Sequence, residues 1–87
     1  MIMHEYEIRI TKQALKDIRK LSPKMKNKLR SILSEVLSKT PYEGKQLVGD
    51  LKGNFSLRLN IYDRIVYSIE EDNKIVYIKR AKTHYRD

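Results

Sequence analysis

The sequence contains no cysteine and no tryptophan, and it has no apolar run that approaches the roughly 20 residues a membrane span requires. Without cysteine, a disulfide, a thiolate zinc site and a thiol nucleophile are all excluded. We therefore expect a cytoplasmic protein with no membrane partner. The chain has 87 residues, which fits a single domain over residues 1–87.

Histidine is scarce too, since the chain has only His4 and His84. Two isolated histidines do not form a ligand set, and the acidic residues show no metal-ligand spacing. We expect neither a bound metal nor another cofactor. Any catalysis must then come from ordinary side chains.

Positive charge is abundant: 19 lysines and arginines oppose 11 aspartates and glutamates, for a net charge of +8. A field of one sign favours a polyanionic partner, and nucleic acid is the commonest. The cations are dense in residues 12–30, where Asp17 is the sole acid. A solvated helical surface is the simpler explanation for that stretch, and composition leaves both open.

Local patterns predict the N-terminal elements. Alternating apolar and polar residues over 6–10 indicate a strand with one buried face. Thr11 occupies an N-cap position before a helix over about 12–21, and Ser22 does so before a second helix that runs from Pro23 to about 38. A short turn joins the two helices into an antiparallel hairpin.

The second half of the sequence reads as a loop followed by strands. Proline and glycine punctuate the loop over 41–54, and strands follow at 55–60, 64–70 and 74–80. The last strand is nearly continuously apolar, which predicts a central position. The order is β-α-α-β-β-β. We expect an α+β fold with two N-terminal helices packed on one face of a small antiparallel sheet.

The last nine residues, 79–87, combine four cations with His84 and Tyr85. Cleavage of RNA by its own 2′-hydroxyl needs a base, an acid and cations around the phosphorus. Imidazole has a reference pKa near about 6.5 and can fill either proton-transfer role. The simpler alternative is a solvated histidine beside a tyrosine that anchors the terminus.

Arginines within strands belong on the sheet face that the helices leave open. We expect Arg64 to lie there among further cations, on a surface that attracts phosphate or RNA. These further cations are Lys45, Lys52, Arg58, Arg80 and Lys82. Alternatively, Arg58 and Arg64 form only surface ion pairs, each worth about 0–1 kcal/mol. The tyrosines at 42, 62, 67 and 77 are expected to pack rather than stack on bases.

Five segments carry a family resemblance. They are Pro41-Tyr42-Glu43-Gly44-Lys45, Leu51-Lys52-Gly53, Ser56-Leu57-Arg58-Leu59, Asp63-Arg64-Ile65-Val66-Tyr67 and Arg80-Ala81-Lys82-Thr83-His84-Tyr85. Together they resemble the RelE/ParE superfamily of bacterial toxins, above all its RelE and YoeB branches. The resemblance covers nearly the whole chain, and its most specific parts are the Arg-Ile-Val-Tyr strand and the terminal His-Tyr pair.

The resemblance implies a RelE-like microbial RNase-type fold and an activity. Such a toxin of a type II toxin–antitoxin system is an mRNA interferase, a ribosome-dependent endoribonuclease that cuts mRNA in the A site and inhibits translation. Its partners are the ribosome, mRNA and a cognate antitoxin. By the same resemblance, Arg64 stabilises the scissile phosphate, His84 transfers a proton, and Tyr85 orients the RNA or assists.

One position departs from the pattern. The YoeB-like branch places a glutamate, the base, after Glu-Gly-Lys, where this chain has Lys45 or Gln46. The general base is thus open between His84 and a lysine of lowered pKa. A ParE-like gyrase inhibitor without nuclease activity is the alternative function, and an RNA-binding module without toxicity is a third. The oligomeric state also stays open.

Overall fold

The computed structural model describes the backbone of residues 5–83 and the side chains of residues 5–81. It begins with strand β1 (Glu7–Ile10), followed by helices α1 (Lys12–Arg19) and α2 (Pro23–Ile32), which continues into the wider turn η1 (Leu33–Leu37). The predicted caps are confirmed. The Thr11 hydroxyl accepts a hydrogen bond from the Ala14 N–H (3.1 Å), and the Ser22 hydroxyl accepts one from the Met25 N–H (3.2 Å).

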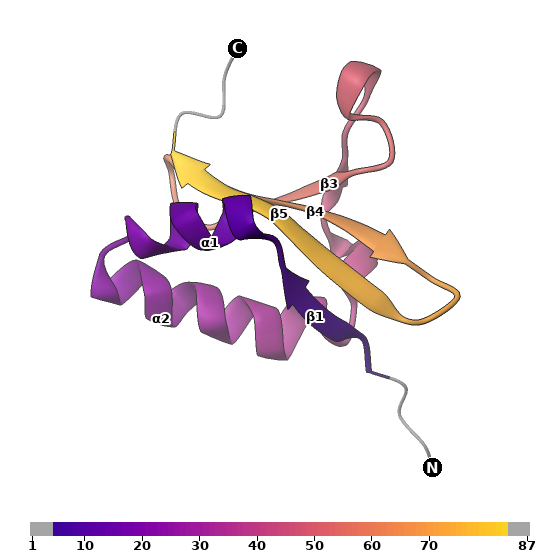
Figure 1. Ribbon diagram of the computed structural model, residues 1–87, viewed down its shortest axis with the longest axis horizontal. Coiled ribbons are helices and arrows are strands. Elements are labelled where there is room, and N and C mark those ends of the chain that lie inside the picture. The colour runs from indigo at the N-terminus through magenta and orange to yellow at the C-terminus, as the bar shows by residue number, and fades with distance from the viewer. Residues whose placement is uncertain (1–4, 84–87) are drawn as a thin grey trace.

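The remaining elements build most of the sheet. They are η2 (Pro41–Glu43), β2 (Lys45–Gln46), η3 (Gly49–Leu51), β3 (Phe55–Arg58), β4 (Asp63–Glu70) and β5 (Ile75–Thr83). The strand order is β1-β5-β4-β3-β2, so β5 has a strand on each side, as its apolar sequence predicted. The fold is α+β with two N-terminal helices, also as expected (Figure 1).

The sheet differs from the expected one at its two edges. β1 pairs with β5 in the parallel direction, which makes the sheet mixed, whereas β2, β3, β4 and β5 pair antiparallel. A parallel neighbour needs a long crossover connection, and the two helices that follow β1 provide it. β2 lies inside the segment predicted as a loop, because two residues are too few to show an alternating pattern.

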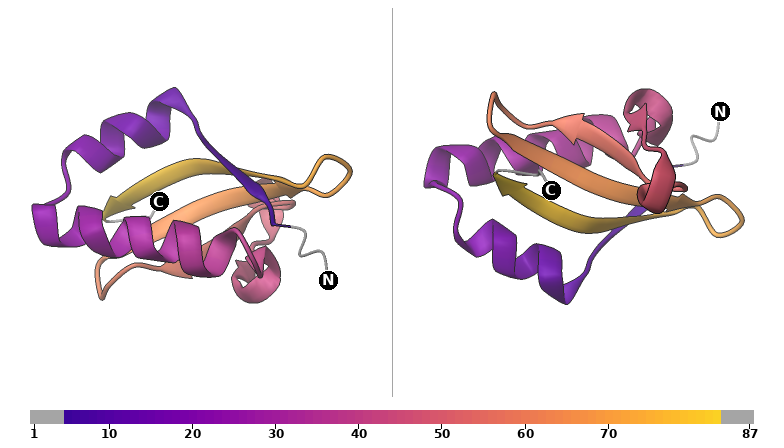
Figure 2. Two further views of the ribbon diagram at one scale, coloured as in Figure 1. Left: turned by 90° about the horizontal axis from the view of Figure 1, so that it is seen from below. Right: turned by 90° about the horizontal axis from the view of Figure 1, so that it is seen from above.

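The core lies between the helices and one face of the sheet. Figure 2 shows the helices on that side, while the view from above looks onto the strands. Ala14 and Leu29 from the helices meet Ile65, Val76 and Ile78 from the sheet, all at most 3% exposed. No helix within residues 5–83 is long and apolar enough to cross a bilayer.

A buried tyrosine fixes the chain where it enters β2. Tyr67 is fully buried, its hydroxyl donates to the Pro41 carbonyl (2.6 Å), and it accepts from the Gly44 N–H (3.1 Å). Burial raises the pKa of Tyr67 to about 12. A Cβ atom on Gly44 would lie 2.1 Å from that hydroxyl oxygen, so only glycine fits without a shift. This contact positions the next residue, Lys45.

A carboxylate ties three segments together at the β4–β5 turn. Glu71 Oε1 accepts hydrogen bonds from the hydroxyls of Tyr6 and Tyr42 (2.8 Å each), and Glu71 Oε2 pairs with Lys74. The Lys74 ammonium also lies 5.0 Å from the centre of the Tyr6 ring. Lys74, then Tyr42 and Tyr6, lower the pKa of Glu71 to about 2.

Candidate phosphate-binding face

The strand register gathers cations at one end of the sheet. Arg58 on β3 is the direct partner of Arg64 on β4, which is in turn the partner of Lys82 on β5. Side chains alternate along a strand, and the neighbours Leu57 and Ile65 pack in or against the core. Arg58 and Arg64 therefore project from the opposite face, away from the side on which α1 and α2 pack (Figure 2).

A second row of paired residues lies next to the first. Lys45 on β2 pairs with Ser56, Ser56 with Val66, and Val66 with Arg80. Ser56 and Val66, in the middle of this row, are only 4% and 3% exposed. The face thus has a small, buried floor with a cation at each end and two arginines beside it.

The opposed pair of Arg58 and Arg64 is unfavourable by itself. Like charges directly opposite on neighbouring strands destabilise a sheet. Within the described side chains, neither arginine forms an ion pair, so the surface ion pairs considered from the sequence are not observed. An anion between the two guanidinium groups would remove the repulsion and gain charge-assisted hydrogen bonds.

Arg80 has a different setting. Its Nε and Nη2 donate to the two carboxylate oxygens of Asp17 (2.8 and 3.2 Å), which is 8% exposed. The Ala81 N–H donates to the same carboxylate (3.0 Å). Such a two-pronged contact is among the stronger polar contacts in proteins. It holds α1 against β5 and places the Arg80 guanidinium at the junction of helix and sheet.

Two groups of predicted residues do not join these rows in the described structure. Lys52 follows η3 and lines a hollow with Gln46 and Phe55, the pair on the core side of β2 and β3. His84 and Tyr85 lie outside the described residues, directly after the end of β5 at Thr83. Within the described part, no group of three or more potential metal ligands occurs.

Known proteins match this chain by structure, and not by a family model or a curated sequence. No protein-family model matches the sequence, and no curated protein matches it either. Solved structures do match. The toxin–antitoxin complex RelBE2 from Mycobacterium tuberculosis contains a chain that superposes with a TM-score of 0.83 at 31% identity, over 92% of this chain and 99% of that one. The protein belongs to the RelE/ParE superfamily of toxins.

Further superfamily structures agree with the assignment. The YoeB–YefM complex from Staphylococcus aureus matches with a TM-score of 0.74 at 26% identity, over 92% of this chain and 98% of that chain. The isolated RelE toxin from E. coli matches with a TM-score of 0.75 at 25% identity, over 94% and 87%. The RelE/ParE resemblance read from the sequence is therefore confirmed.

This RelE/ParE chain also carries site features that sequence reasoning missed. Ile61 and Tyr62 form the β3–β4 turn beside the Arg58–Arg64 pair and are 79% and 68% exposed, so the expectation that Tyr62 packs was wrong. Asn60 Oδ1 fixes the turn by accepting hydrogen bonds from the Tyr62 N–H (2.7 Å) and the following N–H (2.6 Å). Asp17 was overlooked too, although a lone acid in a basic helix is a signal for a specific partner.

Proposed function

We propose that the protein is the toxin of a type II toxin–antitoxin system and an mRNA interferase, an endoribonuclease that cuts mRNA in the ribosomal A site. The observation that carries the proposal is the opposed pair of Arg58 and Arg64, which has no carboxylate partner among the side chains of residues 5–81. The pair weakens the free protein and becomes favourable when an anion binds. A phosphodiester of RNA is the anion that fits a chain of charge +8.

The reaction needs no group beyond those of the chain and the RNA. A base removes the proton of the 2′-hydroxyl, whose oxygen attacks the adjacent phosphorus, and the bond to the 5′ oxygen breaks. An acid protonates that leaving oxygen, so the products are a 2′,3′-cyclic phosphate and a 5′-hydroxyl. Arg64 and Arg58 stabilise the extra negative charge on the phosphorus, a role worth roughly 10²–10³ in rate per donor in comparable sites.

Proton transfer is assigned to His84 and assisted by Tyr85, which follow β5 in the sequence. The base is either His84 or a lysine such as Lys45, and the pH profile of kcat/KM discriminates the two. An imidazole base gives a rate that rises through a pKa near about 6.5. If a lysine is the base, the rise of the rate with pH persists in His84→Gln.

The ribosome and an antitoxin complete the proposal. The ribosome holds mRNA in a reactive geometry, so a small protein with few catalytic groups suffices. The RelBE2 and YoeB–YefM structures are toxin–antitoxin complexes. We infer that this chain likewise binds an antitoxin, one whose acidic, amphipathic segment folds onto the cationic face and blocks it.

The test is cleavage of a defined message in a translating extract. The wild-type protein should cut the message, and Arg64→Ala and His84→Ala should abolish cutting while their circular dichroism spectra stay unchanged. Lys28→Ala, an exposed change on α2, should cut normally. An intact message with the wild type refutes the nuclease proposal. Inhibition of gyrase supercoiling with an intact message would instead identify a ParE-like toxin.

A further inference from the structure

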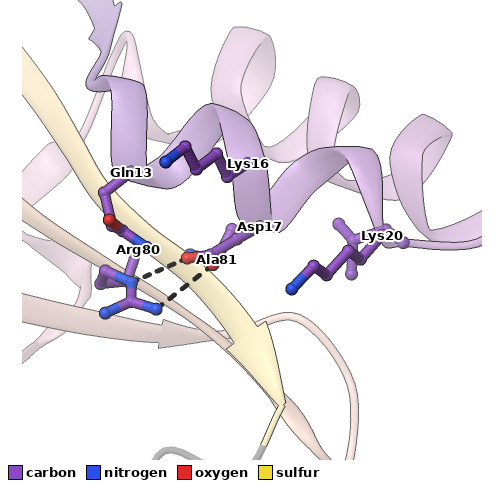
Figure 3. A pocket seen from close by; sticks show the side chains of 7 residues that line it. Gln13, Lys16, Asp17, Lys20, Arg80 and Ala81 are labelled. Atoms are coloured by element: carbon purple, nitrogen blue, oxygen red, sulfur yellow. Dashed lines mark hydrogen bonds and ion pairs between the residues drawn. The ribbon is translucent and has the colours of Figure 1, made fainter.

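A second cationic feature adjoins the face but belongs to α1. Helix α1 and the end of β5 enclose a cleft of about 320 Å³. Figure 3 shows its arrangement: Lys16 on α1 and Lys20, the C-cap of that helix, lie on the two sides of Asp17, which is paired with Arg80 on the strand. Gln13 completes the polar lining.

The charge of the cleft is unbalanced. Among the described lining residues, the carboxylate of Asp17 offsets one of the three cations Lys16, Lys20 and Arg80, which leaves a net charge of +2. Lys16 and Lys20 are exposed and form no ion pair within the described side chains. Lys16 and the cap residue Lys20 are four positions apart, a spacing at which like charges on a helix repel by roughly 0.2–0.5 kcal/mol. An anion bound between the two lysines attracts both of them and so turns this repulsion into a net stabilisation, as it does for the opposed arginines.

Arg80 connects the cleft to the face already described. Its register partner is Val66, one row from the Arg58–Arg64 pair, while its guanidinium reaches Asp17 on α1. The cationic surface therefore continues from the strands around the edge of β5 to α1. An RNA strand that follows this cationic surface from the arginine pair leads toward the cleft.

We propose that the cleft binds a second phosphodiester of the RNA strand, held by Lys16 and Lys20 and placed by the Asp17–Arg80 pair. The proposal rests on the proposed function, since it extends the path of the same RNA. RNA is favoured over an acidic peptide because long polar side chains predominate among the described lining residues, of which Leu21 is the one large apolar side chain. An amphipathic peptide would need more apolar surface to dock.

The test compares two charge-matched double variants of the full chain. Lys16→Gln with Lys20→Gln removes the two lysine charges that line the cleft. Lys24→Gln with Lys28→Gln removes the same charge with the same spacing from α2, where both residues are exposed and outside the cleft. The probe is a 2′-O-methyl single-stranded RNA oligonucleotide, which cannot be cleaved, and binding is followed by fluorescence anisotropy over a salt series.

Loss of one phosphate contact should reduce the slope of log K against log salt by about 0.7 for single-stranded RNA. We expect this reduction in the cleft variant and an unchanged slope in the α2 variant. Equal reductions in both variants would show that only net charge matters and would overturn the proposal. An unchanged slope in both, or weakened antitoxin binding with RNA binding intact, would overturn it as well.

The outcome is separable from that of the nuclease proposal. The nuclease proposal is judged by whether the wild type cuts a message on the ribosome, whereas the cleft is judged by the binding of an RNA that cannot be cut. In one outcome, the message stays intact while the cleft variant alone shows a reduced slope of log K against log salt. That result supports phosphate binding in the cleft and refutes the nuclease proposal. A cut message together with an unchanged slope in the cleft variant refutes phosphate binding in the cleft and supports the nuclease proposal.

Discussion

Arg64→Gln should make the protein more stable and less active at the same time. Arg64 lies directly opposite Arg58, and such like-charge pairs cost about 0.2–1 kcal/mol. For a domain of this size, 1 kcal/mol corresponds to about 4–8 °C in Tm, so we expect a rise of about 1–8 °C. The same change removes a phosphate-stabilising donor and should slow mRNA cleavage by roughly 10²–10³.

The measurement is thermal unfolding by circular dichroism at low salt, with Lys28→Gln as the control. Lys28 is exposed on α2, so its loss changes the net charge equally and should leave the free energy of unfolding within about 0.5 kcal/mol. The gain of Arg64→Gln should shrink near 1 M salt, where the Debye length is about 3 Å. A Tm at or below that of the wild type at low salt would refute the idea that the arginines repel each other.

Three further predictions concern side-chain contacts that stabilise the fold. Tyr67→Phe should destabilise the protein by about 1–3 kcal/mol in urea unfolding, because it leaves the Gly44 N–H and the Pro41 carbonyl without their buried partner; an unchanged midpoint would contradict this. Gly44→Ala should cost about 1–3 kcal/mol, since its Cβ would lie 2.1 Å from the Tyr67 hydroxyl and 2.9 Å from a β3 carbonyl, and Tyr67→Phe should partly relieve the cost. Glu71→Gln should lower stability at pH 7 but hardly at pH 2. The pKa of Glu71 is about 2 in the fold against an ordinary 4.5, so its stabilisation is complete above about pH 4.5 and is lost as pH falls toward 2; parallel stability curves for the two proteins would exclude this role.

Features encoded by near neighbours were predictable from the sequence. Thr11 and Ser22 were predicted as caps because a cap depends on a hydroxyl and an N–H three residues later. The position of β5 between two other strands followed from its continuous apolar residues. The direction of β1 was not predictable in this way, because alternation identifies a strand but not whether its neighbour runs parallel to it.

The candidate site depends more on register than on residue type. The sequence shows arginines at 58 and 64, but their direct opposition follows from the length and geometry of the turn between β3 and β4. The exposure of Tyr62 has the same origin, since the Asn60 hydrogen bonds shape that turn. The Asp17–Arg80 pair joins residues 63 positions apart, a separation over which no local pattern operates.

Helix α1 also shields a vulnerable part of the sheet. β1 pairs with β5 only as far as Ile78, and beyond that point the strand would offer free backbone groups to another chain. The Thr11 hydroxyl and the Asp17 carboxylate meet those groups at Lys79 and Ala81. A variant that detaches α1 from β5 would thus expose an unpaired strand edge. We expect self-association through that edge during synthesis to appear before any loss of catalytic activity.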